Sequence, residues 1–387
     1  MFNNKTTRKE KLLGGVSEGF VVIGDSHVVH DQDNLKITNM FDSLYSLQQA
    51  VDYCKEKRKS LVIAGDLFDK NQFPSRLLDR VRSVVEPLVE EGVPVFGIQG
   101  NHDKDPSYPW FMHIKGSKWL STSPVEVGGH KLCGLDFAPS ASISEALTSV
   151  PPCDGLVIHQ ALRQGLGFEG AWNCDLDWVI NTANVWAGDL HNIDRDLWSK
   201  DKKVRGVYTT SQYMTRVDES DKPSFLDVGA CPQAGGLADY TRVAMKHRPI
   251  HKFHVDSDDS LTAALDQIVD ILLDDRDDLP VEVRRPSLIV TYYADIPGVT
   301  QAVESLTSGG EKAVFHGVAL PSRSQTLFSG IKLADAKEGV TLASLIEERL
   351  DEGELKAFMF DLVNAVSLEE VRNVITVWQD RIYKEAV

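Results

Sequence analysis

The feature that most constrains the fold of this chain is a short apolar run followed at once by a polar cluster, which occurs five times. The run at 20–25 reads FVVIGD, the run at 61–66 reads LVIAGD, and the run at 93–100 reads VPVFGIQG. Two further runs lie at 156–159 and 185–188. Apolar runs of this length that end in turn residues predict buried strands that each enter a loop.

The segments between the first three runs have helical periodicity. Apolar residues recur at intervals of three and four over 41–54 and again over 77–88, which predicts one helix in each segment. Strands and helices that alternate at this pitch form right-handed crossovers around a parallel, buried sheet. The sequence therefore predicts an α/β fold, and a length of 387 residues favours two or three domains over one.

The polar clusters after the runs carry the chemistry. They are Asp25-Ser26-His27, Gly65-Asp66-Leu67-Phe68-Asp69, Gly100-Asn101-His102-Asp103, His159, and Gly188-Asp189-Leu190-His191. Loops at the carboxyl ends of strands in an α/β sheet converge on one crevice. Carboxylates, imidazoles and an amide gathered there suit hard or borderline divalent cations. Each cluster alone is common as an ordinary turn, so the prediction of a metal site depends on all five occurring in this order.

The second part of the chain has a different pattern. From about residue 249 we expect an amphipathic helix near 261–271, a strand at 287–293, a helix near 300–306 and a strand at 313–320. The pattern of segment 341–383 predicts helix throughout, with an interruption near Glu352-Gly353. These changes predict three domains, at 1–248, 249–335 and 336–387, of which the second is a small α+β unit and the third a helical tail.

The charge is also uneven along the chain. Residues 1–248 hold 28 basic and 32 acidic side chains, a net charge of −4, and the remainder holds 13 and 25, a net charge of −12. Nine aspartates lie within 256–278. Nucleic-acid-binding proteins usually carry a basic patch, and no large one is visible here. The charge therefore argues mildly against DNA affinity, without excluding a nuclease whose metal ions meet the phosphates.

The sequence also predicts where the protein works. No run reaches the roughly 18 to 20 apolar residues of a membrane-spanning helix, and the polar, basic N-terminus does not resemble a secretory signal. Five scattered cysteines without a CxxC motif indicate reduced thiols. We therefore expect a cytoplasmic protein, of a cell or of an infected host cell, that has no membrane partner.

Taken together, the five clusters resemble the motifs of the calcineurin-like metallophosphoesterase superfamily, with an Asp-x-His, a Gly-Asp-x-x-Asp, a Gly-Asn-His-Asp, a lone His and a closing Gly-x-x-His. Within that superfamily the chain looks most like the SbcD-type nuclease subunits of DNA repair complexes, including phage versions. The segment AGDLFD at 64–69, followed by Pro74-Ser75, is similar to the second SbcD motif and the start of its helix. The order of a core, a small α+β cap and terminal helices is also similar.

The resemblance implies a site of two divalent metal ions, Mn²⁺ by preference and Mg²⁺ as the alternative, that activate a water for attack on phosphorus. It implies that Asp66 bridges the ions, with Asp25, His27 and His191 at one ion and Asn101, His159 and position 189 at the other. His102 would act on the developing charge or protonate the leaving oxygen. Asp103 would orient His102, and Asp69 would lie behind the ligands or near the phosphate; for both, tying loops together is an equal alternative.

The chain departs from the family pattern at one position. The family ends its motif array with Gly-His-x-His, whereas this chain has Asp189 in place of the first histidine. An aspartate can reach the same ion, but it adds a negative charge that favours harder cations and lowers the Lewis acidity of the pair. Asp189 could therefore bind metal, weaken activity, or point away from the site.

These observations lead to one main hypothesis and two alternatives. The main hypothesis is a manganese-dependent DNA exonuclease and endonuclease, the nuclease subunit of an SbcCD-like repair and recombination complex. Its partners would be DNA, an SbcC-like coiled-coil ATPase bound through the helical tail, and a second copy in a homodimer, as the family implies. The alternatives are a phosphatase or phosphodiesterase for nucleotides or phosphoproteins on the same core, and a scaffold weakened catalytically by Asp189.

Overall fold

Two six-stranded sheets carry the site. We describe a computed structural model, in which the described residues are 15–29, 40–166, 171–214, 219, 222–231, 235–274, 276, 278–294, 296–307 and 313–320. Nearly all of them belong to one compact unit, Met1–Tyr292 with Gly298–Val318. The predicted helical tail at 336–387 lies outside the described residues, so the three domain boundaries stay predictions.

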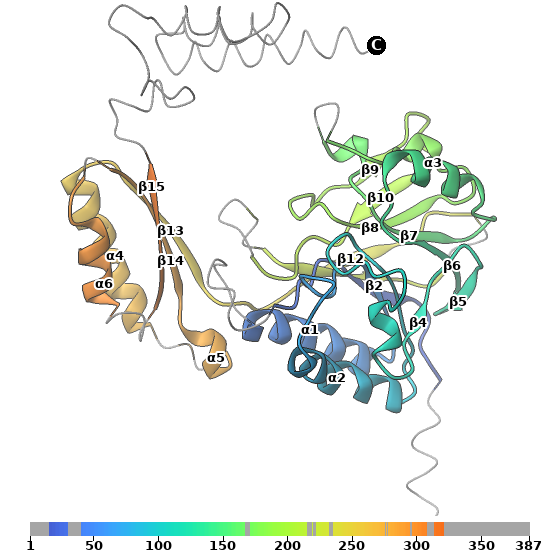
Figure 1. Cartoon of the computed structure of the whole chain (residues 1–387), viewed down its shortest axis with the longest axis horizontal. Coiled ribbons are helices and arrows are strands. Elements are labelled where there is room, and N and C mark those ends of the chain that lie inside the picture. The colour runs from blue at the N-terminus through green and yellow to red at the C-terminus, as the bar shows by residue number, and fades with distance from the viewer. Residues whose placement is uncertain are drawn as a thin grey trace, which may run out of the picture. The chain divides into compact units, whose positions relative to one another are not determined.

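The first sheet has the strand order β12-β11-β1-β2-β3-β4. Figure 1 labels β12, β2 and β4 of this sheet. Its parallel part consists of β1 (Phe20–Ile23), β2 (Ser60–Ala64), β3 (Val95–Ile98) and β4 (Lys118–Trp119). The strands β11 (Ser224–Val228) and β12 (Tyr240–Ala244) add antiparallel pairs beside β1. The three long runs at 20–25, 61–66 and 93–100 therefore become adjacent parallel strands, as predicted.

The second sheet has the order β5-β6-β7-β8-β10-β9. Its parallel strands are β6 (His130–Leu135), β7 (Gly155–His159), β8 (Asn184–Gly188) and β10 (Arg205–Tyr208). The short strands β5 (Val125–Val127) and β9 (Leu197–Trp198) are antiparallel at the two edges. The two later runs predicted from the sequence are thus the adjacent strands β7 and β8.

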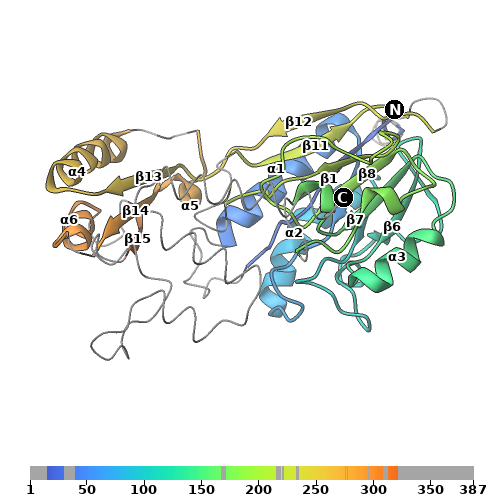
Figure 2. The same cartoon turned by 90° about the horizontal axis from the view of Figure 1, so that it is seen from above.

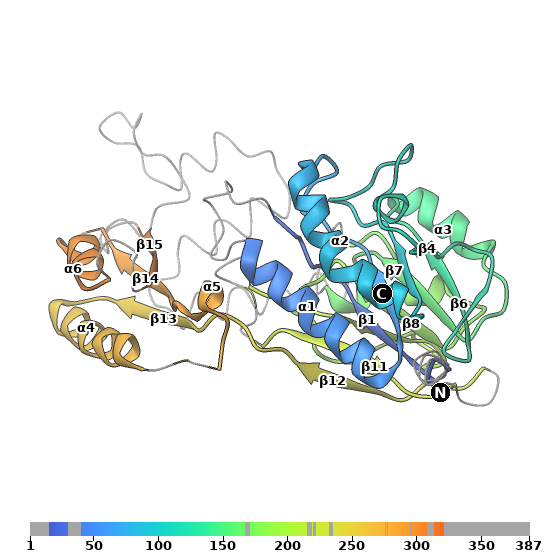
Figure 3. The ribbon, with the colours of Figure 1, turned by 90° about the horizontal axis from the view of Figure 1, so that it is seen from below.

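Alternate residues of each strand face different layers. In β1, Val21 and Ile23 pack with the helices α1 (Met40–Lys57) and α2 (Ser75–Glu90), whereas Phe20 and Val22 pack in the core between the two sheets. Figure 3 shows α1 and α2 side by side across the first sheet. On the far face of the second sheet, α3 (Ser140–Thr148) lies beside β6 (Figure 2). The order helix, sheet, sheet, helix confirms the predicted α/β class.

Strand, helix and strand alternate again after residue 249. A three-stranded sheet of β13 (Ile250–Val255), β14 (Ser287–Tyr293) and β15 (Val314–Leu320) packs with α4 (Asp258–Leu273) and α6 (Val299–Leu306). A short helix, α5 (Val281–Arg284), precedes β14. Ser257 and Ser260 form a reciprocal capping box at the start of α4. The predicted elements are present, whereas β13 is an additional strand that the sequence pattern did not predict.

A buried ion pair connects α1 with the segment that leads into β13. Nε and Nη2 of Arg248 lie 2.9 Å and 3.0 Å from the two carboxylate oxygens of Asp42. Arg248 also donates to the main-chain oxygens of Glu282 and Arg285. Both side chains of the pair are almost fully buried. The hydrogen bonds named above take up nearly all the donors of the Arg248 guanidinium, as a buried charge requires.

The sequence predicts reduced cysteines and no membrane-spanning helix. All five cysteines are unpaired, and four of them are buried. In the described part of the chain, no helix has both the length and the apolar character needed to cross a membrane.

Candidate metal centre

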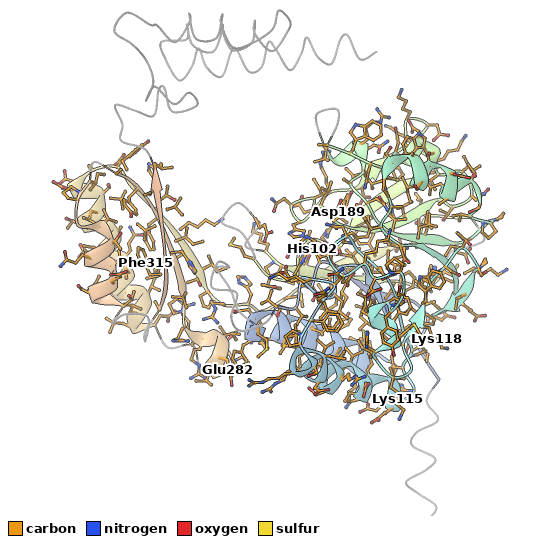
Figure 4. The ribbon with its side chains drawn as sticks, in the orientation of Figure 1. His102, Lys115, Lys118, Asp189, Glu282 and Phe315 are labelled. Atoms are coloured by element: carbon orange, nitrogen blue, oxygen red, sulfur yellow. The ribbon has the colours of Figure 1, made fainter. Side chains whose placement is uncertain are left out.

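The predicted site residues come together where the carboxyl ends of the strands of both sheets meet. Two loops follow β1 and β2, a third follows β3, His159 is the last residue of β7, and the final loop follows β8. Figure 4 marks His102 and Asp189, which belong to the loops after β3 and β8. The residues delivered by these elements are Asp25, His27, Asp66, Asp69, Asn101, His102, Asp103, His159, Asp189 and His191.

A first group of ligand atoms consists of Asp25, His27 and His191. Nε2 of His191 lies 3.3 Å from Oδ1 of Asp25 and 3.3 Å from Nε2 of His27. Nε2 of His27 lies 3.9 Å from the same oxygen of Asp25. These three residues are the ones that the family resemblance assigns to one ion.

A second group consists of Asp25, Asp66 and His159. Nε2 of His159 lies 3.2 Å from Oδ2 of Asp66, 4.0 Å from Oδ1 of Asp25 and 3.0 Å from Oδ1 of Asn101. Oδ2 of Asp66 also lies 3.6 Å from Nε2 of His27 in the first group. Asp66 is thus situated between the groups, which is the place predicted for a bridging ligand, and Asp25 takes part in both.

The donor atoms have the spacing that a divalent cation requires. Metal bonds of about 2.1 Å place neighbouring ligand atoms roughly 3 to 3.5 Å apart around a common centre, and the closest contacts within both groups fall near this range. Imidazole nitrogens mixed with carboxylate and amide oxygens suit Mn²⁺, Zn²⁺ or Mg²⁺. The residues present therefore fit a divalent metal centre.

Backbone strain is concentrated in this site. Asp25, His27, Asp66 and Asp189 have positive φ angles of 53°, 38°, 50° and 100°. Left-handed conformations are uncommon for residues other than glycine and cost about 1–3 kcal/mol each. The surrounding fold holds all four in this conformation, and the result is that their side chains turn back toward the crevice.

Two glycines make the close approach of the loops feasible. A Cβ atom on Gly100 would lie 2.0 Å from Oδ1 of Asp66, and a Cβ atom on Gly188 would lie 2.7 Å from Nδ1 of His159. Any larger residue at either position would displace a predicted metal ligand. The glycines in the motifs therefore provide space for ligand side chains as well as tight turns.

The charges of the site attract protons in the absence of a cation. Burial alone would lower the pKa of His159, but the carboxylates of Asp66 and Asp25 raise it to about 10. Burial likewise opposes the charged form of His191, yet Asp25 and Glu219 raise its pKa to about 10. For Asp25, burial is outweighed by His191, His159 and His27, which hold its pKa below the usual value. The site is thus rich in negative charge, as a centre that binds cations must be.

His102 occupies the rim of the site. Its side chain is 44% exposed, and its ring lies edge-on to that of His27 with 4.7 Å between centroids. Nδ1 of His102 lies 2.9 Å from the main-chain oxygen of Asp69. An accessible imidazole at this position can reach a substrate, as the prediction for His102 requires. The group His27, Asp69 and His102 is also close enough to share a cation, so ligation by His102 is the alternative.

The contacts of Asp103 correspond to the loop-tying alternative of the two roles that the sequence left open for it. Its Oδ2 accepts hydrogen bonds from the amides of Leu67 (2.7 Å) and Phe68 (3.3 Å), and its Oδ1 accepts from the amide of Gly100 (2.8 Å). Burial and the neighbouring Asp66 raise its pKa to about 7. Asp103 therefore ties the β2 loop to the β3 loop, and the main chain of Asp69, rather than Asp103, holds the His102 ring.

The carboxylate of Asp69 lies on the Nδ1 side of the His27 ring, whereas Nε2 faces the other ligand atoms. Its Oδ1 lies 3.4 Å from Nδ1 of His27 and 4.0 Å from Nδ1 of His102. The carboxylate is nearly buried, with 11% of the side chain exposed. This position matches the interpretation of Asp69 as a residue that supports a ligand from behind.

Asp189 lies beside the second group. Its Oδ1 is 4.0 Å from Nε2 of His159, and its amide donates to both carboxylate oxygens of Asp25 at 3.1 Å and 3.2 Å. Burial raises the pKa of its carboxyl group. The side chain of Asp189 thus lies next to the second group, at a longer distance from Nε2 of His159 than Asp66.

Sequence reasoning missed one residue of the site, Glu219. Its Oε1 lies 2.7 Å from Nδ1 of His191, and the residue is 5% exposed. Glu219 belongs to the segment 199–223, which reads as a loop without any recognisable motif. No sequence signal identifies it, because a single acidic residue in such a segment is most often solvated.

Comparison with known proteins agrees with this geometry. Residues 19–207 match the family model described as calcineurin-like phosphoesterase, and they include all ten predicted site residues. These residues therefore form a calcineurin-like phosphoesterase domain.

The chain is also similar to proteins named DNA double-strand break repair protein Mre11. It is 28% identical to the protein of Sulfurisphaera tokodaii over 185 residues, which are 44% of this chain and 48% of that relative. It is 27% identical to the protein of Sulfolobus acidocaldarius over 45% of this chain and 50% of the relative, and 24% identical to that of Methanosarcina acetivorans over 46% and 31%. The chain thus matches about half the length, or less, of these relatives, and the match supports the predicted relationship to nucleases of the SbcD type.

Proposed function

We propose that this protein is a metal-dependent phosphodiesterase that hydrolyses DNA, acting as the nuclease subunit of a repair complex. The observation that carries the proposal is the pair of ligand groups that share Asp25 and have Asp66 between them, with the exposed His102 at their rim. The similarity to proteins named for the repair of DNA double-strand breaks supports DNA as the substrate.

In this mechanism the ligand groups hold two divalent cations. Asp25, His27 and His191 would hold one, and Asn101, His159 and Asp189 the other, with Asp66 between them. Such cations neutralise phosphate charge and activate water for in-line attack on phosphorus. The main-chain oxygen of Asp69 orients the His102 ring, which then stabilises the developing charge or donates a proton to the leaving oxygen.

The metal and the partners are part of the proposal. The mixture of imidazole and oxygen donors favours Mn²⁺, with Mg²⁺ as the alternative. By the family resemblance, an SbcC-like coiled-coil ATPase would bind the helical segment after residue 336. The protein would act as a homodimer in the cytoplasm.

A phosphatase or phosphodiesterase for smaller substrates is the second candidate, and the charge of the chain is the observation that favours it. A net charge of −16 repels duplex DNA over much of the surface. A scaffold that has lost its chemistry at Asp189 is the third candidate.

The test is hydrolysis by the full chain with Mn²⁺. Linear duplex DNA, a mononucleotide and bis-p-nitrophenyl phosphate would be assayed together, with and without a coiled-coil ATPase encoded beside the gene. Cleavage of the duplex supports the nuclease. Turnover of only the two small esters supports the second candidate, and Mn²⁺ binding without any turnover supports the scaffold.

A further inference from the structure

The contact between Glu219 and His191 distinguishes one ligand group from the other. Nδ1 of His191 and Oε1 of Glu219 are 2.7 Å apart, and the Glu219 side chain is 4% exposed. A carboxylate taken out of water at this depth needs a strong partner, and a hydrogen bond from an imidazole N–H to a carboxylate is of the strong, charge-assisted kind. The main-chain oxygen of Glu219 in turn accepts a hydrogen bond from Nζ of Lys252 at 3.3 Å.

The contact determines which ring nitrogen of His191 faces the centre. When Nδ1 carries the proton that is donated to Glu219, Nε2 keeps its lone pair. That Nε2 lies 3.3 Å from both Oδ1 of Asp25 and Nε2 of His27. Glu219 thus presents His191 to the first ligand group in the form that binds a metal.

The histidine of the second group has a weaker supporting partner. Nδ1 of His159 lies 2.8 Å from the main-chain oxygen of Ala64, which is a neutral acceptor. A carboxylate behind a ligand imidazole makes its far nitrogen more basic than a carbonyl oxygen does. His191 is therefore a stronger donor to its group than His159 is to the other group.

We propose that Glu219 is a positioning residue that makes the group of Asp25, His27 and His191 the tighter of two divalent-cation sites. The inference rests on the metal centre of the proposed function and deepens it by giving the two sites an order of filling. Removal of such a supporting carboxylate typically weakens metal affinity about 10–100-fold, and here the loss should fall on one site only.

The substitution that isolates the charge is Glu219→Gln, because an amide oxygen can still accept the hydrogen bond from Nδ1. Calorimetric titration of the full chain with Mn²⁺ alone should show two binding steps in the unaltered protein. Glu219→Gln should weaken the tighter step by about 10–100-fold and leave the weaker step unchanged. Glu219→Asp should recover part of the loss, and Glu126→Gln, at an exposed position on β5, should have no effect.

A second measurement reports which nitrogen of the His191 ring carries a proton. Nitrogen NMR of the protein loaded with the diamagnetic Zn²⁺ should show His191 protonated at Nδ1 and unprotonated at Nε2 in the unaltered protein, and an altered Nδ1 signal in Glu219→Gln. Thermal unfolding identifies a variant that has merely lost its fold, in which case Glu219→Asp carries the test. Two unchanged binding steps in Glu219→Gln, or a single class of equal sites in the unaltered protein, would overturn the inference. Because no nucleic acid is present, failure of DNA cleavage would refute the proposed function without affecting this result.

Discussion

The Nε2 atom of His27 lies 3.3 Å from the Nε2 atom of His191, although 164 positions separate the two residues in the chain. Two ring nitrogens at this distance can share one proton or bind one cation, since each offers a single lone pair. His191 Nδ1 is already in contact with Glu219, so Nε2 is the ring nitrogen that faces the ligand groups. The pair is therefore arranged for a cation between the nitrogens.

The first prediction is that divalent metal stabilises the fold. A ligand that binds only the native state at 100 times its Kd adds about 2.7 kcal/mol to the free energy of unfolding. The melting temperature should therefore rise when Mn²⁺ is added to protein stripped with a chelator. His27→Ala should lose most of this rise. Equal melting temperatures with and without Mn²⁺ would contradict a metal centre at this position.

The second prediction concerns Asp66, the carboxylate between the two groups. Asp66→Ala should abolish hydrolysis, because Oδ2 of Asp66 is 3.6 Å from Nε2 of His27 and 3.2 Å from Nε2 of His159, and it is the carboxylate that the family resemblance assigns to both ions. The measurement is the rate with bis-p-nitrophenyl phosphate and Mn²⁺. Asp79→Ala, at an exposed position on α2, is the matched control. Near-normal turnover in Asp66→Ala would refute the arrangement with two ions.

The third prediction separates catalysis by His102 from metal binding. His102→Ala should keep both Mn²⁺ ions and lose about 10²–10⁴-fold in turnover, the usual contribution of a positioned acid or base. Metal content and rate would be measured on the same sample. If metal occupancy falls together with the rate, His102 is a ligand in the group that also contains His27 and Asp69.

The fourth prediction concerns stability away from the site. Asp42→Ala leaves the guanidinium of Arg248 buried without its carboxylate, which should cost about 3–5 kcal/mol of unfolding free energy. Denaturant unfolding measures the change. The control is Lys55→Ala, which breaks a surface pair with Glu91 and should cost less than about 1 kcal/mol. A similar loss of unfolding free energy in both variants would show that burial does not increase the contribution of the Arg248–Asp42 pair to stability.

Much of the core was predictable because its signals are local. The runs that became β1, β2 and β3 are apolar over four or five residues and end in turn residues, and the helix α2 shows its buried stripe of Leu77, Val81, Val85 and Leu88 directly in the sequence. In the α+β unit, β14 has the bounds expected from its apolar run. The strand β13 was missed because its sequence, IHKFHV, has two adjacent polar residues that break the strict alternation of polar and apolar residues expected of a half-buried strand.

The residue types of the site were predictable, but its supporting contacts were not. The glycine and polar motifs after each strand indicate which side chains converge. The left-handed backbone of Asp25 and His27, by contrast, is imposed by tertiary packing and leaves no local signature. The same holds for Glu219, which contacts a residue 28 positions earlier, and for Asp103, whose partners are main-chain amides that any sequence provides.

The last prediction concerns Asp189, which stands where the motif that the chain resembles has a histidine. If its carboxylate binds the second ion, that ion has one more negative charge among its ligands than a histidine at this position would give. The charge favours the harder Mg²⁺ and makes the attacking water harder to deprotonate, so the pH of half-maximal rate should be raised. Asp189→Asn removes the charge with little change of shape and should shift the preference toward Mn²⁺ and lower that pH. Asp189→His should do the same, although its backbone must adopt the observed φ of 100°.

Asp189→Ala completes this test, because it should empty one ion position and leave the group of Asp25, His27 and His191 filled. Metal content by elemental analysis and pH–rate profiles with Mn²⁺ and with Mg²⁺ are the measurements. The amide of Asp189 still donates to Asp25 in each variant, so the first group keeps its main-chain support. If metal content and pH profile stay unchanged in Asp189→Asn and Asp189→Ala, Asp189 is not a ligand. The second ion would then depend on Asp66, Asn101 and His159, and the scaffold hypothesis would gain over the nuclease.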